Sequence, residues 1–262
     1  MLGRATASSR RHDGAVGDEL IHRVRRARRE RSLVVVEGFH ALKHALRFGA
    51  ELVEAYAVDP PALEELAREL APDLAGGLAD RVRAIDAEAL ARMVPLVPRT
   101  GVVAIARRPP VDLTTTLAEP RPAPVVLLED PRNMGNIGAC VRVAAAADAA
   151  ALLTTGENDP WYPDAVRGAA GLHFALPVTA IDDLPASDRP LLAIDPEGED
   201  LDPRSLPPRA VLAFGTERHG LTGGLLERAD GRVAIPMREG VSSLNLATSV
   251  AVVLFAMRLA AG

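Results

Sequence analysis

The sequence predicts an α/β fold in which a mostly parallel sheet is covered by helices on both faces. From residue 125 onward, short apolar runs that suit strands alternate with longer segments that suit helices. With 262 residues, 48% of them hydrophobic, the chain can bury one large core or two modest ones. A segment rich in proline at 109–122 lacks any periodic pattern, which predicts an interdomain linker and therefore two domains.

The first domain is expected over residues 18–108. Residues 1–17 lack apolar periodicity and are predicted to be a disordered tail. Gly49 suits the end of a helix, and Pro61 suits the first turn of another. The predicted elements are helix 18–32, strand 33–38, helix 39–49, strand 52–59, helix 61–70, strand 82–86, helix 87–94 and strand 101–107. Together they predict a small α/β unit.

The second domain, 123–262, is predicted to hold the parallel sheet. Its strands are expected at 125–129, 151–155, 174–179, 191–195, 210–214 and 232–235. Its helices are expected at 136–147, 162–169, 222–228 and 244–260. Polar residues such as Asn245 and Arg258 interrupt the last apolar stretch, so a buried helix is predicted there rather than a membrane span, and no membrane partner is expected.

Composition argues against several functional classes. Cys140 is the only cysteine, which excludes an intramolecular disulfide framework and a site with several cysteine ligands. The sequence contains no histidine or acidic motif of the kind that binds a metal, so no metal site is expected. The basic N-terminal residues are not followed by an apolar segment, so no secretory signal is expected and the predicted location is the cytoplasm.

Charge is unevenly distributed along the chain. The formal net charge of −5 disfavours a nucleic-acid partner, because phosphate contacts need lysine or arginine. The first 48 residues nevertheless hold eleven Lys and Arg against five Asp and Glu. The cluster is either a solvated helix face or an RNA-binding surface. Its candidate RNA contacts are Arg23, Arg25, Arg26, Arg28 and Arg29.

Three segments combine glycine or proline with a few polar groups near the end of an apolar run: NIGACVR (136–142), FGTERHG (214–220) and IPMREGVSSLN (235–245). Parallel α/β proteins place ligand sites at such strand ends. In the first segment, Asn136 suits a helix N-cap and Gly138 allows close backbone approach, which favours an anionic group such as a phosphate. A tight turn without a ligand is the alternative.

The three segments together resemble the signature motifs of the SpoU (TrmH) branch of the SPOUT RNA 2′-O-ribose methyltransferases. The matching residues are Asn136, Gly138 and Arg142 in the first motif, Gly215, Glu217, Gly220 and Leu221 in the second, and Ile235, Pro236, Met237, Ser243, Leu244 and Asn245 in the third. The resemblance covers residues 123–262. The N-terminal unit is similar, more loosely, to the ribosomal-protein-like substrate-binding domain of many members.

This resemblance implies a parallel sheet with a deep trefoil knot, a homodimer, and S-adenosylmethionine as methyl donor without a metal. It implies methylation of a ribose 2′-oxygen in RNA, and the N-terminal unit favours ribosomal RNA over tRNA. The implied cofactor contacts are Gly215, Ile235, Met237 and Leu244. The implied catalytic or substrate-orienting residues are Arg142, Asn136, Glu217, Ser243 and Asn245.

Arg142 is interpreted as a phosphate clamp that also stabilises the developing alkoxide, because a guanidinium group is a poor base at neutral pH. The proton acceptor is left open among the phosphate, a water molecule and Glu217. The alternative functions are a tRNA 2′-O-methyltransferase, a catalytically decayed RNA-binding protein on the same fold, and a nucleotide-binding α/β enzyme unrelated to RNA.

Overall fold

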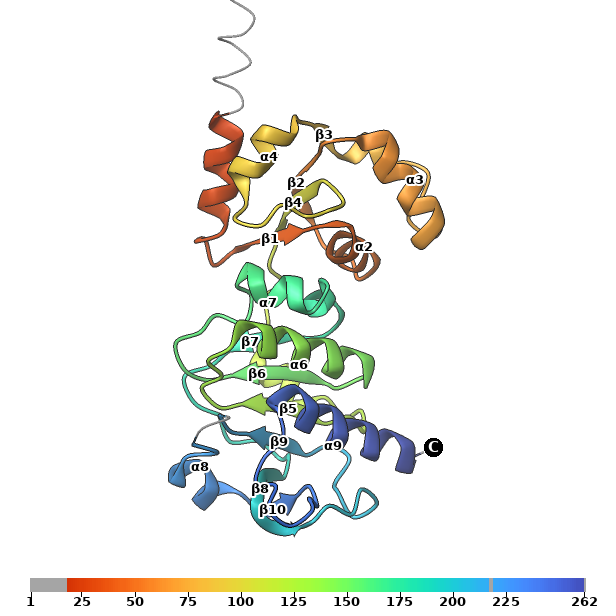
Figure 1. Cartoon of the computed structure of the whole chain (residues 1–262). Helices are drawn as coiled ribbons and strands as arrows, with labels where there is room; N and C mark the ends of the chain where they lie inside the picture. Colours follow the sequence, from red (N-terminus) through yellow and green to blue (C-terminus); the bar gives the residue numbers. More distant parts are fainter. Residues whose placement is uncertain (1–17, 217–218, 262) are drawn as a thin grey trace, which may run out of the picture. The chain divides into compact units, whose positions relative to one another are not determined.

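The computed structural model describes residues 18–216 and 219–261. The chain folds as two compact units, with the boundary between Arg108 and Pro109 (Figure 1). The tail predicted at 1–17 lies outside the described residues. No helix in the described part of the chain is long and apolar enough to cross a membrane.

The first unit contains a sheet with the strand order β1-β4-β2-β3. Its strands are β1 (Leu33–Glu37), β2 (Leu52–Ala57), β3 (Arg83–Ala84) and β4 (Val102–Arg107). β4 is antiparallel to both β1 and β2, whereas β3 is parallel to β2. Of the strand expected at 82–86, only the two residues of β3 pair in the sheet.

Helices complete this unit. Residues 18–27 are helical and pack with α4 (Ala87–Met93) against the sheet, where Val24 and Met93 bury their side chains. The helix expected to reach residue 32 gives way to a turn at Arg28, whose side chain pairs with the buried Glu37 at the end of β1. The other elements are α2 (Phe39–Arg47), α3 (Pro60–Leu70) and the 3-10 helix η1 (Ala79–Arg81).

The second unit contains the predicted parallel sheet, with the strand order β10-β8-β9-β5-β6-β7. All five neighbouring pairs are parallel, which confirms the predicted sheet type. The strands are β5 (Val125–Leu128), β6 (Ala151–Thr154), β7 (Val178–Ala180), β8 (Leu191–Asp200), β9 (Val211–Phe214) and β10 (Gly231–Ala234). The trefoil knot implied by the family resemblance stays a prediction.

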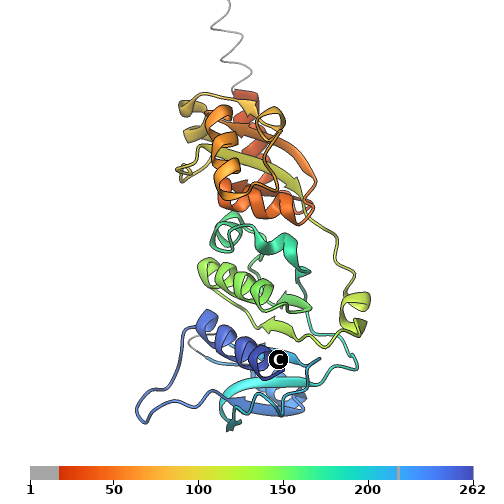
Figure 2. The same cartoon turned by 90° about the vertical axis from the view of Figure 1, so that its right-hand side faces the viewer.

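Helices cover both faces of this sheet. α6 (Met134–Ala146) and α9 (Leu246–Ala261) pack together on one face, and Figure 2 shows α5 (Leu113–Ala118) on the other. Leu117 of α5 and Leu225 of α8 (Gly223–Arg228) join one core with the strand residues of that second face. α7 (Pro163–Gly168) packs against α6.

One predicted strand is partly wrong. The segment expected as a strand at 174–179 begins as the 3-10 helix η2 (Leu172–Ala175), and β7 starts only at Val178. His173 and Phe174 of η2 pack on the Trp161 ring, with ring centroids 4.9 and 5.2 Å away. This buried ring cluster holds both residues out of the sheet.

The expected linker contains a helix that belongs to the second unit. Asp112 caps α5 by accepting a hydrogen bond from the Thr114 backbone N–H at 3.0 Å. The buried Arg189 guanidinium fixes the segment by donating to the carbonyl oxygens of Leu117, Glu119, Ala123 and Arg209 at 2.7 to 3.0 Å. Burial lowers the pKa of Arg189, because the charged guanidinium is partly removed from water.

A fragment of residues 109–262 is therefore expected to be more stable than one of residues 123–262. The shorter fragment loses the burial of Leu117, which is worth about 1.5–3 kcal/mol. It also loses two of the carbonyl oxygens that accept hydrogen bonds from the Arg189 guanidinium. We expect a difference of roughly 3 kcal/mol or more in the free energy of unfolding, measured by urea denaturation. Equal stabilities would show that α5 adds nothing to the second unit.

Candidate functional site

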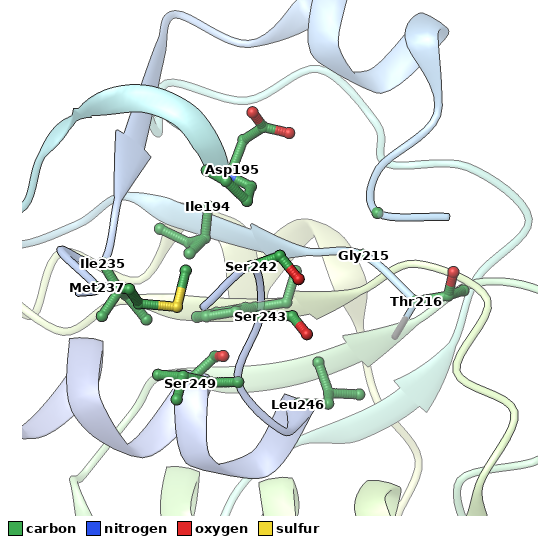
Figure 3. A pocket seen from close by; sticks show the side chains of 14 residues that line it. Ile194, Asp195, Gly215, Thr216, Ile235, Met237, Ser242, Ser243, Leu246 and Ser249 are labelled. Carbon is green, nitrogen blue, oxygen red and sulfur yellow. The ribbon is translucent and has the colours of Figure 1, made fainter. Parts of the chain in front are cut away.

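A pocket of about 320 Å³ lies beside the carboxyl ends of β9 and β10 and the adjoining part of β8 (Figure 3). Apolar side chains and four hydroxyl groups form most of its wall. The lining residues are Ile194, Asp195, Pro196, Phe214, Gly215, Thr216, Gly220, Ile235, Met237, Ser242, Ser243, Leu244, Leu246 and Ser249. A mostly apolar cavity with a few polar groups suits a small organic ligand.

The pocket brings the second and third motifs together. The four predicted cofactor contacts, Gly215, Ile235, Met237 and Leu244, all line it, and so does Ser243. These residues lie far apart in the sequence, but β9 and β10 deliver them to one edge of the sheet. The site is therefore assembled by the topology of the sheet.

A hydrogen bond joins the first motif to the third. The Asn245 side-chain amide donates from Nδ2 to Oδ1 of Asn136 at 3.2 Å. Asn245 Oδ1 accepts from the backbone N–H groups of Ala247 and Thr248, so this residue also caps α9. The helix expected at 244–260 begins at Leu246, so Ser243 and Leu244 lie in the segment before it.

The start of α6 differs from the expectation at two residues. Asn133, rather than Asn136, is the N-cap, and its Oδ1 accepts from the Asn136 backbone N–H at 3.0 Å. The Asn136 side chain is thereby left to contact Asn245. Close packing against α7 requires glycine at position 138, because an added Cβ atom would lie 2.3 Å from the Ala165 carbonyl oxygen. Its close approach is to protein rather than to a phosphate.

Of the predicted catalytic residues that the structure describes, Ser243 lines the pocket, whereas Asn136, Arg142 and Asn245 are not among the lining residues. Arg142 lies exposed on α6, is not among the lining residues, and has no hydrogen bond or ion pair with any residue of the described chain. Glu217 lies outside the described residues. The residues flanking it are placed, because Thr216 and Gly220 exchange two backbone hydrogen bonds at 3.0 and 3.1 Å and both line the pocket.

The packing of its own loop requires glycine at position 215. A Cβ atom at this position would lie 2.0 Å from the Gly220 carbonyl carbon, so a side chain must displace the loop that closes on Thr216. We expect Gly215→Val to weaken ligand binding in this pocket at least about tenfold, measured by calorimetric titration. Gly223→Ala is the control, because its Cβ would meet nothing within 4 Å. Unchanged binding in a folded Gly215→Val protein would place the ligand elsewhere.

The arginine cluster of the first unit is only partly available to a partner. Arg28 is largely buried and pairs with Glu37, which removes it from the candidate RNA contacts. Arg23 pairs with Glu54, and Arg25 donates to the Arg92 carbonyl oxygen at 3.1 Å. The remaining cluster residues, Arg26 and Arg29, are exposed on the surface.

Sequence reasoning missed several residues that line the pocket. Asp195 lies in β8 next to Ile194, which pairs with the last residue of β9. A carboxylate at the point where a parallel strand leaves the core is a signal that could have identified Asp195. Thr216 lies inside the second motif, and Ser249 lies in the first turn of α9. Among the described residues, no group of three His, Cys, Asp or Glu side chains could hold a metal ion.

Comparison with known proteins gives a consistent match. The model of the SpoU rRNA Methylase family matches residues 123–255. An uncharacterized tRNA/rRNA methyltransferase of Mycobacterium bovis is 33% identical over 239 residues, which cover 86% of this chain and 80% of that protein. The 23S rRNA (adenosine(1067)-2′-O)-methyltransferase of Streptomyces azureus is 29% identical, with 84% of each chain covered.

Solved structures share the fold. A structure described as an RNA 2′-O ribose methyltransferase aligns with a TM-score of 0.67 and 28% identity, covering 97% of this chain and 98% of that one. The SpoU methyltransferase AviRb from Streptomyces viridochromogenes, in complex with the cofactor AdoMet, aligns with a TM-score of 0.71 and 24% identity over 87% of this chain and 90% of that one.

Proposed function

Because the chain belongs to the SpoU rRNA methylase family and is therefore an RNA methyltransferase, we propose that it methylates a ribose 2′-hydroxyl group in ribosomal RNA. S-adenosylmethionine is the methyl donor. The observation that carries the proposal is the pocket in which Gly215, Ile235, Met237 and Leu244 come together. Its apolar wall suits the adenine ring, and its hydroxyl groups suit the polar parts of the donor.

The reaction requires a donor and an acceptor in line. The bond between the methyl carbon and the sulfonium sulfur breaks as the methyl group bonds to the ribose 2′-oxygen, which leaves a neutral thioether. The hydroxyl proton passes to an acceptor, which is the adjacent phosphate, a water molecule or Glu217. In this proposal the hydrogen bond between Asn136 and Asn245 fixes the edge of the site beside the pocket. Ser243, at the pocket wall, orients the substrate. Arg142 holds the adjacent phosphate and stabilises negative charge on the oxygen.

A homodimer is proposed from the surface of α9. Val252 and Phe255 are each 38% exposed and Leu259 is 79% exposed, and their spacing places all three on one face of the helix. A second copy of the chain would cover this apolar face. Since Arg142 does not line the pocket of its own chain, we propose that the partner copy brings it to the site.

Phe255→Asp is expected to shift the protein toward a monomer, because the interface would have to bury an unpaired carboxylate. We expect the dimer dissociation constant to rise at least about tenfold, measured by analytical ultracentrifugation. Leu96→Asp, at an apolar residue of the first unit that is 61% exposed, is the control. A dimer unaffected by Phe255→Asp would place the interface away from this face.

Ribosomal RNA is preferred over tRNA as the substrate. The S. azureus relative is named as a 23S rRNA enzyme, and its similarity covers 84% of this chain. This share is larger than the second unit alone, so the similarity extends into the N-terminal unit. The test supplies labelled S-adenosylmethionine with protein-free ribosomal RNA or with total tRNA. We expect label only in the ribosomal RNA, and label only in tRNA would overturn the choice of substrate.

A further inference from the structure

We propose that Asp195 makes the pocket selective for the cationic methyl donor over its product, S-adenosylhomocysteine. The inference rests on the donor named under the proposed function. S-adenosylmethionine carries a positively charged sulfonium, which becomes a neutral thioether when the methyl group leaves. The product therefore has one positive charge less than the donor, with the same adenine, ribose and amino-acid groups. A fixed negative charge in the pocket distinguishes the two ligands.

Asp195 is the only charged residue among the described residues that line the pocket. The other lining residues are apolar, glycine, serine or threonine. In Figure 3 the Asp195 carboxylate points away from the hydroxyl groups of Ser243 and Ser249. No arginine or lysine of the described chain forms a salt bridge with it. Its negative charge is therefore available to a cationic ligand.

The side chain is held in place by its own turn. Asp195 Oδ1 accepts a hydrogen bond from the Glu197 backbone N–H at 2.8 Å. This bond uses one carboxylate oxygen, and the described residues make no further hydrogen bond to the side chain. The residue is half-buried, so its interaction with a bound ligand is screened less than that of a fully exposed charge. The other oxygen faces no competing donor from the described part of the protein.

The hydrogen bond in this turn allows a substitution that removes the charge and preserves the local structure. Asn has the shape of Asp and retains Oδ1 as an acceptor for the Glu197 N–H, so Asp195→Asn removes the charge while keeping the turn. Asp200→Asn is the matched control. Asp200 lies at the exposed end of the same strand, its side chain has no partner among the described residues, and the substitution changes the net charge by the same amount.

The experiment measures the affinity of the full chain for S-adenosylmethionine and for S-adenosylhomocysteine by calorimetric titration. Asp195→Asn is expected to weaken donor binding about tenfold and product binding by no more than about twofold. Asp200→Asn is expected to leave both affinities unchanged. In the unmodified protein, rising salt should weaken donor binding more than product binding, because the charge interaction is screened.

Equal losses for the two ligands in Asp195→Asn, or an unchanged donor affinity, would overturn the proposal. An equal loss of donor affinity in Asp200→Asn would also overturn the proposal, because the loss would then follow from the net charge of the protein rather than from the position of Asp195. A protein that binds the donor with this selectivity and yet does not methylate ribosomal RNA would refute the proposed substrate while leaving the role of Asp195 intact.

Discussion

Replacing Arg142 with alanine is expected to slow methyl transfer about a hundredfold or more, while the affinity for S-adenosylmethionine changes little. The guanidinium is expected to stabilise charge that develops on the ribose oxygen, and removal of one such donor costs at least about 2.7 kcal/mol in known cases. Arg142 lies outside the pocket wall, so the donor should bind normally. Single-turnover kinetics with saturating donor measures the chemical step apart from binding.

Arg142→Lys separates the two possible roles of this residue. A lysine retains positive charge and loses the planar fork that binds a phosphate through two hydrogen bonds, so its rate should fall between those of the wild type and the alanine variant. A rate that rises with pH as the lysine loses its proton would instead show that the residue acts as a base. That result would contradict the clamp assigned to Arg142.

Removal of residues 1–108 is expected to weaken RNA binding at least about tenfold and to leave donor affinity unchanged, because the pocket lies wholly in the second unit. The fragment to use is 109–262, which keeps α5. Filter binding over a range of salt concentrations also shows how many RNA phosphates the protein neutralises. Each phosphate that the fragment no longer binds should reduce the log–log salt slope by about 0.7 for single-stranded and 0.9 for duplex sites.

The cluster arginines provide a matched comparison within that surface. Arg26 has a side chain that is 85% exposed, whereas the Arg28 side chain is 12% exposed and pairs with Glu37. Arg26→Ala should therefore reduce the salt slope without loss of stability. Arg28→Ala should destabilise the first unit, because it leaves the Glu37 carboxylate buried without this partner ion.

The truncation has an outcome that would contradict this account. Full RNA affinity and an unchanged salt slope in the 109–262 fragment would assign RNA recognition to the second unit alone.

Much of the fold could be predicted because its signals are local. The apolar runs that became β5, β6 and β9 are buried along their whole length, as expected for strands covered on both faces. The failures come from tertiary interactions. The Trp161 ring holds His173 and Phe174 in a 3-10 turn, and Arg189 fixes α5 from about 70 residues away in the chain. Neither interaction leaves a periodic pattern in the sequence.

The site was predictable where a motif names its residues and unpredictable where the topology supplies them. The motifs identified Gly215, Ile235 and Leu244, which meet in one pocket. They did not identify Asp195, which comes from a strand outside all three motifs. They also gave Asn136 as the cap of α6, whereas the structure shows Asn133 in that role, three residues earlier.

The central claim is that the methyl group is placed on a ribose 2′-oxygen of ribosomal RNA, and the position of the label tests it most directly. Ribosomal RNA methylated with labelled donor would be hydrolysed in alkali, which requires a free 2′-hydroxyl group at each cleaved bond. We predict that the label appears in an alkali-resistant dinucleotide, and that the Arg142→Ala protein yields little of it. Label recovered in a single nucleotide, as a methylated base, would contradict the account.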